Sequence, residues 1–155
     1  AGRLARAHGR PLTAPVGSLT HEFPSPDVLA GLSVEELPMP AGRARALIGL
    51  AEVLASGVIA LDPGSDRAEV AARLLKLPGI GPWTVAYINM RALGDPDAFM
   101  PSDLGVRRAL ERLGLPADER GATALAEQWR PYRAYALQYL WSSLADPSPV
   151  ASRTA

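Results

Sequence analysis

Helix-breaking residues recur along this sequence, and each run between them is about as long as one short helix. Proline and glycine number 15 and 14 in a chain of 155 residues. Apolar residues between these breakers follow helical spacing, and no segment of strand length alternates apolar with polar residues. We therefore predict an all-α fold, in which short helices pack around one core.

Capping residues and breakers predict where the helices begin and end. The segment 3–8 reads as the end of a helix that Gly9 closes. Ser33 and Glu36 form a capping box that opens a short helix. Further helices are expected over 25–31, 41–56, 66–76, 82–93, from 102 or 103 onward, 120–129 and 131–144.

The same signals bear on domain organisation. Residues 1–145 are expected to form one domain, and the Pro/Ser-rich tail 146–155 is expected to be disordered. The first helix lacks a start signal, and the sequence begins without methionine. We expect a chain truncated at its N-terminus.

Composition limits the chemistry that the chain can support. Basic and acidic side chains number 16 each, which argues against a protein that binds nucleic acid through diffuse positive charge. The absence of cysteine excludes disulfides, thiolate zinc sites and cysteine-ligated iron–sulfur clusters. His8 and His21 alone make a poor metal set. With no signal peptide and no apolar run near the roughly 20 residues of a membrane span, we expect a soluble, cytoplasmic protein.

The most informative stretch is the turn Leu77-Pro78-Gly79-Ile80-Gly81 between two predicted helices. Glycines on both sides of Ile80 allow a sharp turn and a close approach of the backbone to a ligand. Free amides at the start of the second helix favour an anion such as DNA phosphate. This helix-hairpin-helix motif can therefore hold DNA without a net positive charge, although the same pattern by itself also suits a plain interhelical turn.

Three aromatic residues and one aspartate add a candidate site. Trp83 and Tyr87 are four residues apart and share one helix face, and Trp141 lies on the last long helix. Electron-rich rings attract a cation by roughly 0.5 to 2 kcal/mol each, but each aromatic could instead be a core residue. Asp103 begins a helix, where it could cap the helix, stabilise a cationic transition state, or do both. Gly105 lies inside that helix, and the sequence assigns it no role.

In combination, these motifs resemble the helix-hairpin-helix DNA glycosylase superfamily, and most closely its DNA-3-methyladenine glycosylase II (AlkA) type. The resemblance rests on Gly79–Thr84, on Asp103, on the segment 129–136 and on Trp141, in that order along nearly the whole chain. It implies a bacterial base excision repair enzyme, associated with the nucleoid, that flips alkylated bases from duplex DNA and hydrolyses their N-glycosidic bond. It also implies that a helix carrying the wedge residue and a small β-rich domain precede Ala1.

The resemblance also implies a role for individual residues. Asp103 is the catalytic aspartate, and no second acid is needed because a cationic base leaves with little protonation. The base-stacking aromatics are Trp83, Tyr87 and Trp141. The remaining implied contacts are phosphate binding by the amides of Gly79, Gly81 and Thr84, and a monovalent cation, Na⁺ or K⁺, at the carbonyls of Leu75, Leu77 and Ile80.

Other inferences concern the reaction and the partners. Superfamily members that also cleave the strand carry a lysine at the position of Trp83, so we expect simple hydrolysis, with Lys76 as a solvated charge. No cofactor is expected to be required, a monomer is expected, and an Ada-type alkyl-transfer domain is a candidate upstream partner. Three alternatives stay open: a non-catalytic DNA-binding module, a glycosylase for another lesion, and a purely structural helical domain. Tyr132, Tyr135 and Tyr139 are interpreted as structural.

Overall fold

The computed structural model describes residues 1–145, so the predicted disordered tail 146–155 lies outside the described residues. The chain divides into two compact units. The first comprises Ala1–Leu61 and Ala68–Gly81, and the second comprises Asp62–Arg67 and the chain from Pro82 onward. One domain over 1–145 stays a prediction, and each unit is described by itself.

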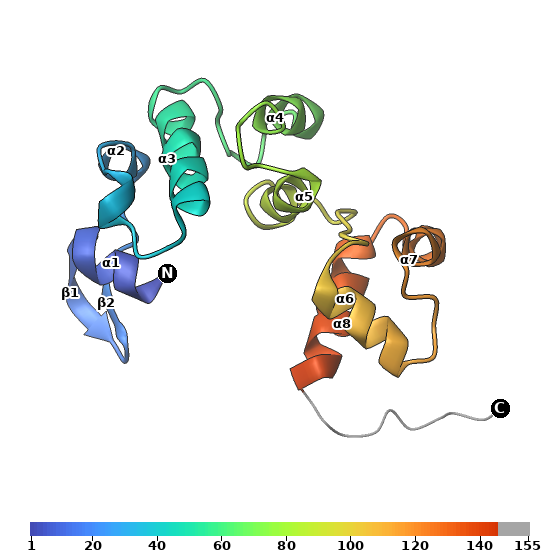
Figure 1. Cartoon of the computed structure of the whole chain (residues 1–155). Helices are drawn as coiled ribbons and strands as arrows, with labels where there is room; N and C mark the ends of the chain where they lie inside the picture. The colour runs from blue at the N-terminus through green and yellow to red at the C-terminus, as the bar shows by residue number, and fades with distance from the viewer. Residues whose placement is uncertain (146–155) are drawn as a thin grey trace. The chain divides into compact units, whose positions relative to one another are not determined.

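The described residues are mainly helical, which confirms the predicted fold class (Figure 1). Most helices begin and end within a few residues of the predicted positions, because the capping residues are in place. Ser25 precedes a helix that Gly31 follows, and Ser33 and Glu36 form the expected capping box on a 3-10 turn. The helices are α1 Gly2–His8, α2 Pro26–Ala30, η1 Val34–Glu36, α3 Ala41–Ala55, α4 Arg67–Leu74, α5 Pro82–Arg91, α6 Leu104–Arg112, α7 Glu119–Ala126, η2 Glu127–Trp129 and α8 Arg133–Ala145.

A small β-hairpin in the first unit is a feature that the sequence analysis missed. Strands β1 (Pro11–Val16) and β2 (Leu19–His21) pair antiparallel, and Gly17 takes the left-handed conformation, with φ of +57°, in the turn between them. Most residues of β1 are exposed, so no face of the strand is buried. Without a buried face a strand has no reason to alternate apolar and polar residues, and the period-2 signal is therefore absent.

The core of the first unit lies around α3. Ala44 and Ala51 on α3 are buried together with Leu29 of α2, Leu37 after η1 and Leu4 of α1. These small and aliphatic side chains recur at helical spacing on α3, which is the pattern that predicted a core helix. The first three helices thus bury their apolar faces against one another.

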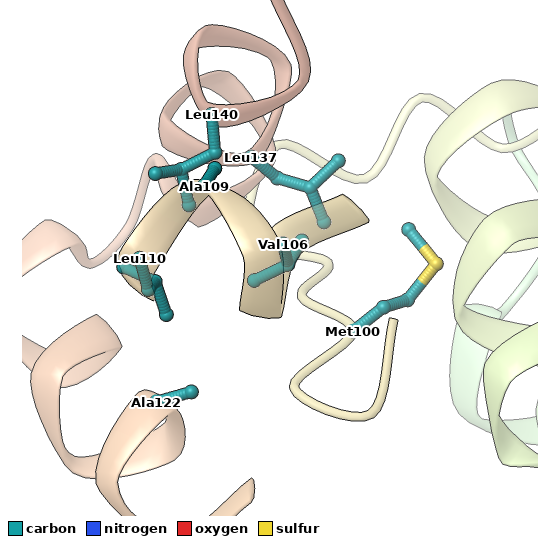
Figure 2. Packing of buried hydrophobic residues seen from close by; sticks show 7 residues of the cluster. All are labelled: Met100, Val106, Ala109, Leu110, Ala122, Leu137 and Leu140. Carbon is teal, nitrogen blue, oxygen red and sulfur yellow. The ribbon is translucent and has the colours of Figure 1, made fainter. Parts of the chain in front are cut away.

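The core of the second unit joins α6, α7 and α8. Figure 2 shows Val106, Ala109 and Leu110 of α6 together with Leu137 and Leu140 of α8, and Ala122 of α7 nearby. Val106, Leu110 and Leu137 are completely buried. Truncating a leucine at such a position typically costs about 2 to 5 kcal/mol, so this cluster fixes α6 against α8.

An ion-pair cluster holds the loop before α6 to the start of α8. Arg133 donates to Asp97 through Nε and Nη2, at 2.7 and 2.8 Å, and Arg130 adds a bond of 2.6 Å. The amide of Ala134 donates to the carbonyl of Pro96 at 2.9 Å. The Arg133 hydrogen bonds prevail over desolvation and lower the pKa of Asp97.

Two further observations concern the surface. Tyr132, Tyr135 and Tyr139 are 61%, 61% and 78% exposed, so they are not core residues, and their interpretation as structural residues stays a prediction. Tyr135 and Tyr139 lie on the face of α8 opposite the buried Leu137, because their spacing of four residues follows the helical repeat, and Tyr132 precedes the helix. No helix within residues 1–145 is long and apolar enough to cross a membrane.

Candidate active site

Asp103 is the residue around which the candidate site is built. Its backbone is extended, with φ of −67° and ψ of 128°, and its Oδ1 accepts a hydrogen bond from the amide of Val106 at 2.9 Å. Asp103 is therefore the N-cap of α6, as predicted. The side chain of Val106 is buried in the core, while its amide donates to the Asp103 carboxylate. Packing of α6 therefore fixes where the carboxylate lies.

Two tryptophans from other helices donate to the same carboxylate. Nε1 of Trp141 on α8 lies 2.9 Å from Oδ1 of Asp103, and Nε1 of Trp83 on α5 lies 2.9 Å from Oδ2. The sequence named all three residues as site candidates but predicted no direct bond among them. Hydrogen bonds from neutral donors to a carboxylate are stronger than those between neutral groups, so these bonds link the three side chains into one unit.

This environment keeps Asp103 ionised. Partial burial acts in the opposite direction and is the largest single effect, since it disfavours the charged form. Hydrogen bonds from Trp141, the Val106 amide, Trp83 and the Gly105 amide together outweigh it, and the pKa of Asp103 lies below its ordinary value. A carboxylate of this kind is a persistent negative charge and a weak proton acceptor.

The aromatic rings form a cluster beside the carboxylate. Trp83 and Tyr87 are stacked with centroids 5.3 Å apart and planes 11° apart, and Tyr87 lies 6.3 Å from Trp141 at a tilt of 44°. Trp83 is 41% exposed and Tyr87 36%, so part of this surface is open to a ligand. The structure thus brings together all of the predicted base-binding aromatics.

Arg91 is a member of this cluster that the sequence analysis missed. Its guanidinium carbon lies 5.7 Å from the centroid of the Tyr87 ring. Trp83, Tyr87 and Arg91 follow one another at four-residue spacing on α5, and this spacing is the signal that could have identified Arg91. Because Tyr87 stacks on one face of the Trp83 ring, a ligand can stack only on the other face.

The predicted hairpin is present, but the boundary between the two units falls between Gly81 and Pro82. On its first side, Gly79 has a φ of +83°, and the carbonyl of Leu77 accepts from the amide of Ile80 at 3.1 Å. Thr84 lies on the other side, in the first turn of α5. Phosphate binding by the amides of Gly79, Gly81 and Thr84 therefore stays a prediction.

Metal binding has little support from side chains in the described part of the chain. No group of three or more His, Asp or Glu residues is placed to hold a metal ion between residues 1 and 145. The expected monovalent cation would use main-chain carbonyls of Leu75, Leu77 and Ile80 instead. Of these, the Leu77 oxygen already accepts one hydrogen bond and retains a lone pair, so the cation stays a prediction.

Comparisons with known proteins agree with these features, although no family model matches the chain. A Mycobacterium tuberculosis protein described as a probable bifunctional transcriptional activator/DNA repair enzyme AlkA is 48% identical over 95% of this chain and 30% of its own length. DNA-3-methyladenine glycosylase 2 of Escherichia coli is 34% identical over 77% of this chain and 42% of its own length. The chain thus spans less than half of either relative.

Solved structures share the fold. The 3-methyladenine DNA glycosylase of Archaeoglobus fulgidus matches 90% of this chain and 48% of its own, with a TM-score of 0.75 and 24% identity. The Schizosaccharomyces pombe 3-methyladenine DNA glycosylase in complex with abasic DNA matches 81% of this chain and 66% of its own, with a TM-score of 0.73 and 25% identity. An 8-oxoguanine glycosylase/lyase of Clostridium acetobutylicum matches 93% of this chain and 51% of its own, with a TM-score of 0.74 and 22% identity.

Fold, motif and relatives agree on the class. The chain belongs to the helix-hairpin-helix DNA glycosylase superfamily, as the sequence resemblance predicted. Within that superfamily it is a homologue of the DNA-3-methyladenine glycosylases of the AlkA type.

Proposed function

We propose that this chain is the helical catalytic part of a monofunctional DNA glycosylase, which removes alkylated bases of the 3-methyladenine type from duplex DNA. The observation that carries the proposal is the ionised Asp103, held by two indoles beside an exposed aromatic surface. A fixed negative charge next to stacking rings suits a reaction in which both the base and the sugar become cationic.

Asp103 would act mainly through its charge. Cleavage of an N-glycosidic bond leaves an oxocarbenium-like sugar, and a carboxylate within a few ångströms stabilises that cation as it forms. Because the pKa of Asp103 is lowered, the carboxylate is a poor general base. We therefore assign it to charge stabilisation and to orienting the attacking water, which can bind the lone pair of Oδ2 that Trp83 leaves free.

Trp83 would supply the stacking surface for the flipped base. Its ring is the more exposed member of the Trp83–Tyr87 stack, and a cationic purine gains roughly 0.5 to 2 kcal/mol from each ring that it contacts. Tyr87 extends the electron-rich surface behind Trp83. Trp141 is committed to Asp103 through its Nε1, so it would border the pocket rather than carry the base.

The remaining assignments follow from the hairpin and from the resemblance. Amides of Gly79, Gly81 and Thr84 would bind phosphates of duplex DNA, and the hairpin carbonyls would hold a monovalent cation. The protein would act as a monomer in the bacterial cytoplasm near the nucleoid, with an Ada-type domain as a candidate upstream partner. Strand cleavage is not expected, although at least one protein of similar fold is a glycosylase/lyase, because Trp83 offers no amine.

Base release from DNA containing hypoxanthine tests this proposal, because a neutral base cannot leave as readily as a cationic one. Asp103→Asn keeps the capping oxygen but removes the charge and replaces the oxygen that accepts from Trp83 by an NH2 group, so excision should fall by at least about a hundredfold while damaged DNA still binds. Asp118→Asn is the matched control. Asp118 caps α7 through a bond of 3.0 Å to the Gly121 amide and contacts no tryptophan in the site, so its variant should excise normally.

The alternative of a non-catalytic DNA-binding module predicts a different result. Such a module binds duplex DNA through the hairpin but releases no base, with or without the Asp103→Asn substitution. Near-wild-type hydrolysis by a folded Asp103→Asn protein would instead move the catalytic role to another residue.

A further inference from the structure

Gly105 occupies the second position of α6, directly after the cap and Leu104. Glycine inside a helix costs about 1 kcal/mol relative to alanine. Its backbone is not in the left-handed region that favours glycine, so helix geometry alone does not require this residue. Something outside the helix backbone must explain it.

The surroundings of Gly105 supply the explanation. A Cβ atom at this position would lie 3.0 Å from Oδ1 of Asp103, 3.0 Å from Cδ1 of Trp141 and 3.1 Å from its Nε1. Asp103 Oδ1 and Trp141 Nε1 are the two atoms of the 2.9 Å hydrogen bond that joins these residues. Neither group moves aside freely, because the carboxylate caps α6 and the indole packs on the core.

We propose that Gly105 is a positioning residue whose missing side chain leaves the space through which Trp141 reaches Asp103. The inference rests on the proposed function of Asp103. An alanine at this position would force the indole and the carboxylate apart by a few tenths of an ångström and so weaken the bond between them, while the Val106 and Trp83 bonds remain. Among the donors, Trp141 makes the largest contribution to lowering the pKa of Asp103, so its loss would also weaken the hold on the charge.

Other glycines of the chain provide matched controls. Gly49 lies inside α3 with nothing within 4 Å of an added Cβ, so Gly49→Ala reports only the gain in helix propensity. At Gly121 in α7, an added Cβ would meet Cβ of Pro116 at 2.6 Å and Oδ2 of the capping Asp118 at 2.8 Å. Gly121→Ala therefore reports a crowded cap without a tryptophan from the site.

The experiment compares Gly105→Ala, Trp141→Phe and the double variant with these two controls. We expect Gly105→Ala to shift the indole N–H resonance of Trp141, with Trp129 as the internal reference, and to slow hypoxanthine excision about tenfold, as expected for one hydrogen bond to a charged group. Trp141→Phe should slow excision by a similar factor. The double variant should be no slower than either single variant, because both changes remove the same bond. Both controls should excise at the wild-type rate.

Stability is measured for all variants, because crowding could also unfold the chain. If Gly105→Ala is too unstable to assay, removal of the whole ring in Gly105→Ala/Trp141→Ala should restore folding to the level of Trp141→Ala, because the crowded atoms Cδ1 and Nε1 are then absent; failure to do so would overturn the proposal. An unchanged indole resonance with normal excision in Gly105→Ala, or additive losses in the double variant, would also overturn it. A wild-type chain that releases no base counts against the proposed function alone. The indole resonance of Trp141 in Gly105→Ala then decides whether Gly105 is needed for the bond between Trp141 and Asp103.

Discussion

Asp103 serves the helix and the candidate site with the same side chain. Its Oδ1 accepts from the α6 amide and from Trp141, and its Oδ2 accepts from Trp83. A capping carboxylate is already favoured by the helix dipole, so the fold helps to keep the charge that the proposed chemistry needs. Stability and reactivity therefore depend on one ionised group.

The identity of residue 83 decides which reaction the site can run. A Schiff base needs an amine, and Trp83 provides none, while Lys76, the one lysine of the sequence, is an exposed residue that follows α4. Borohydride reduction during turnover is therefore expected to trap no covalent protein–DNA adduct. Peptide mapping of a trapped adduct to Lys76 would show that the lyase assignment is wrong.

Asp97 gives a pH-dependent prediction at the same scale. Arg133 lowers the pKa of Asp97, which means that the charged carboxylate is more stable in the folded state than in the unfolded state. Stability from this ion pair is present above the ordinary pKa of 3.8 and is lost as the pH falls through the lower pKa of the folded state. Asp97→Asn should thus lower the melting temperature at neutral pH.

The difference in melting temperature between the wild type and Asp97→Asn should shrink at acidic pH below that ordinary value. Glu52→Gln, on an exposed position of α3, serves as a control for a change of one surface charge. A difference that is the same at neutral and acidic pH would mean that Asp97 stabilises the loop through packing rather than through its charge.

Among the larger elements, the hairpin contains two glycines with different demands. Gly79 has a positive φ, and an added Cβ would lie 2.8 Å from Cβ of Ala46 on α3. Gly81 has neither feature, and nothing lies within 4 Å of an added Cβ there. Gly79 is therefore needed for packing of the first unit, whereas Gly81 is left for a close approach of DNA.

Alanine substitutions should separate these two roles. Gly79→Ala should lower stability by at least about 1 to 2 kcal/mol, the usual penalty for a left-handed non-glycine residue, because the clash with Ala46 adds to that penalty. Gly81→Ala should fold normally and bind duplex DNA more weakly. Urea unfolding and a DNA titration measure both effects, and wild-type affinity of Gly81→Ala would place the phosphate contact elsewhere.

For the whole molecule, the balance of charge predicts how DNA binding responds to salt. With 16 basic and 16 acidic side chains, few counterions can be released, and the hairpin donates neutral amides. The slope of log affinity against log salt should therefore be well below that of a protein that neutralises about ten phosphates. Binding titrations at several salt concentrations measure this slope, and a steep one would reveal a basic surface other than the hairpin.

Local signals in the sequence determined most of the helices, the hairpin loop and the cap at Asp103, because capping, breaking and helical spacing act over a few residues. Membership of the superfamily also came from the sequence, through the order of its motifs. The β-hairpin was missed because an exposed strand carries no alternating pattern.

Only the tertiary structure decided which groups meet. The bonds of Trp83 and Trp141 to Asp103 join residues 20 and 38 positions apart. Capping and helical spacing act over a few residues, so they cannot predict a hydrogen bond across that separation. The same holds for Gly105, which in the sequence is only a residue of low helix propensity inside a predicted helix. Its meaning depends on the core of α6 and α8, because packing of Val106 and Leu137 brings Trp141 to the place where a side chain on residue 105 would collide with it.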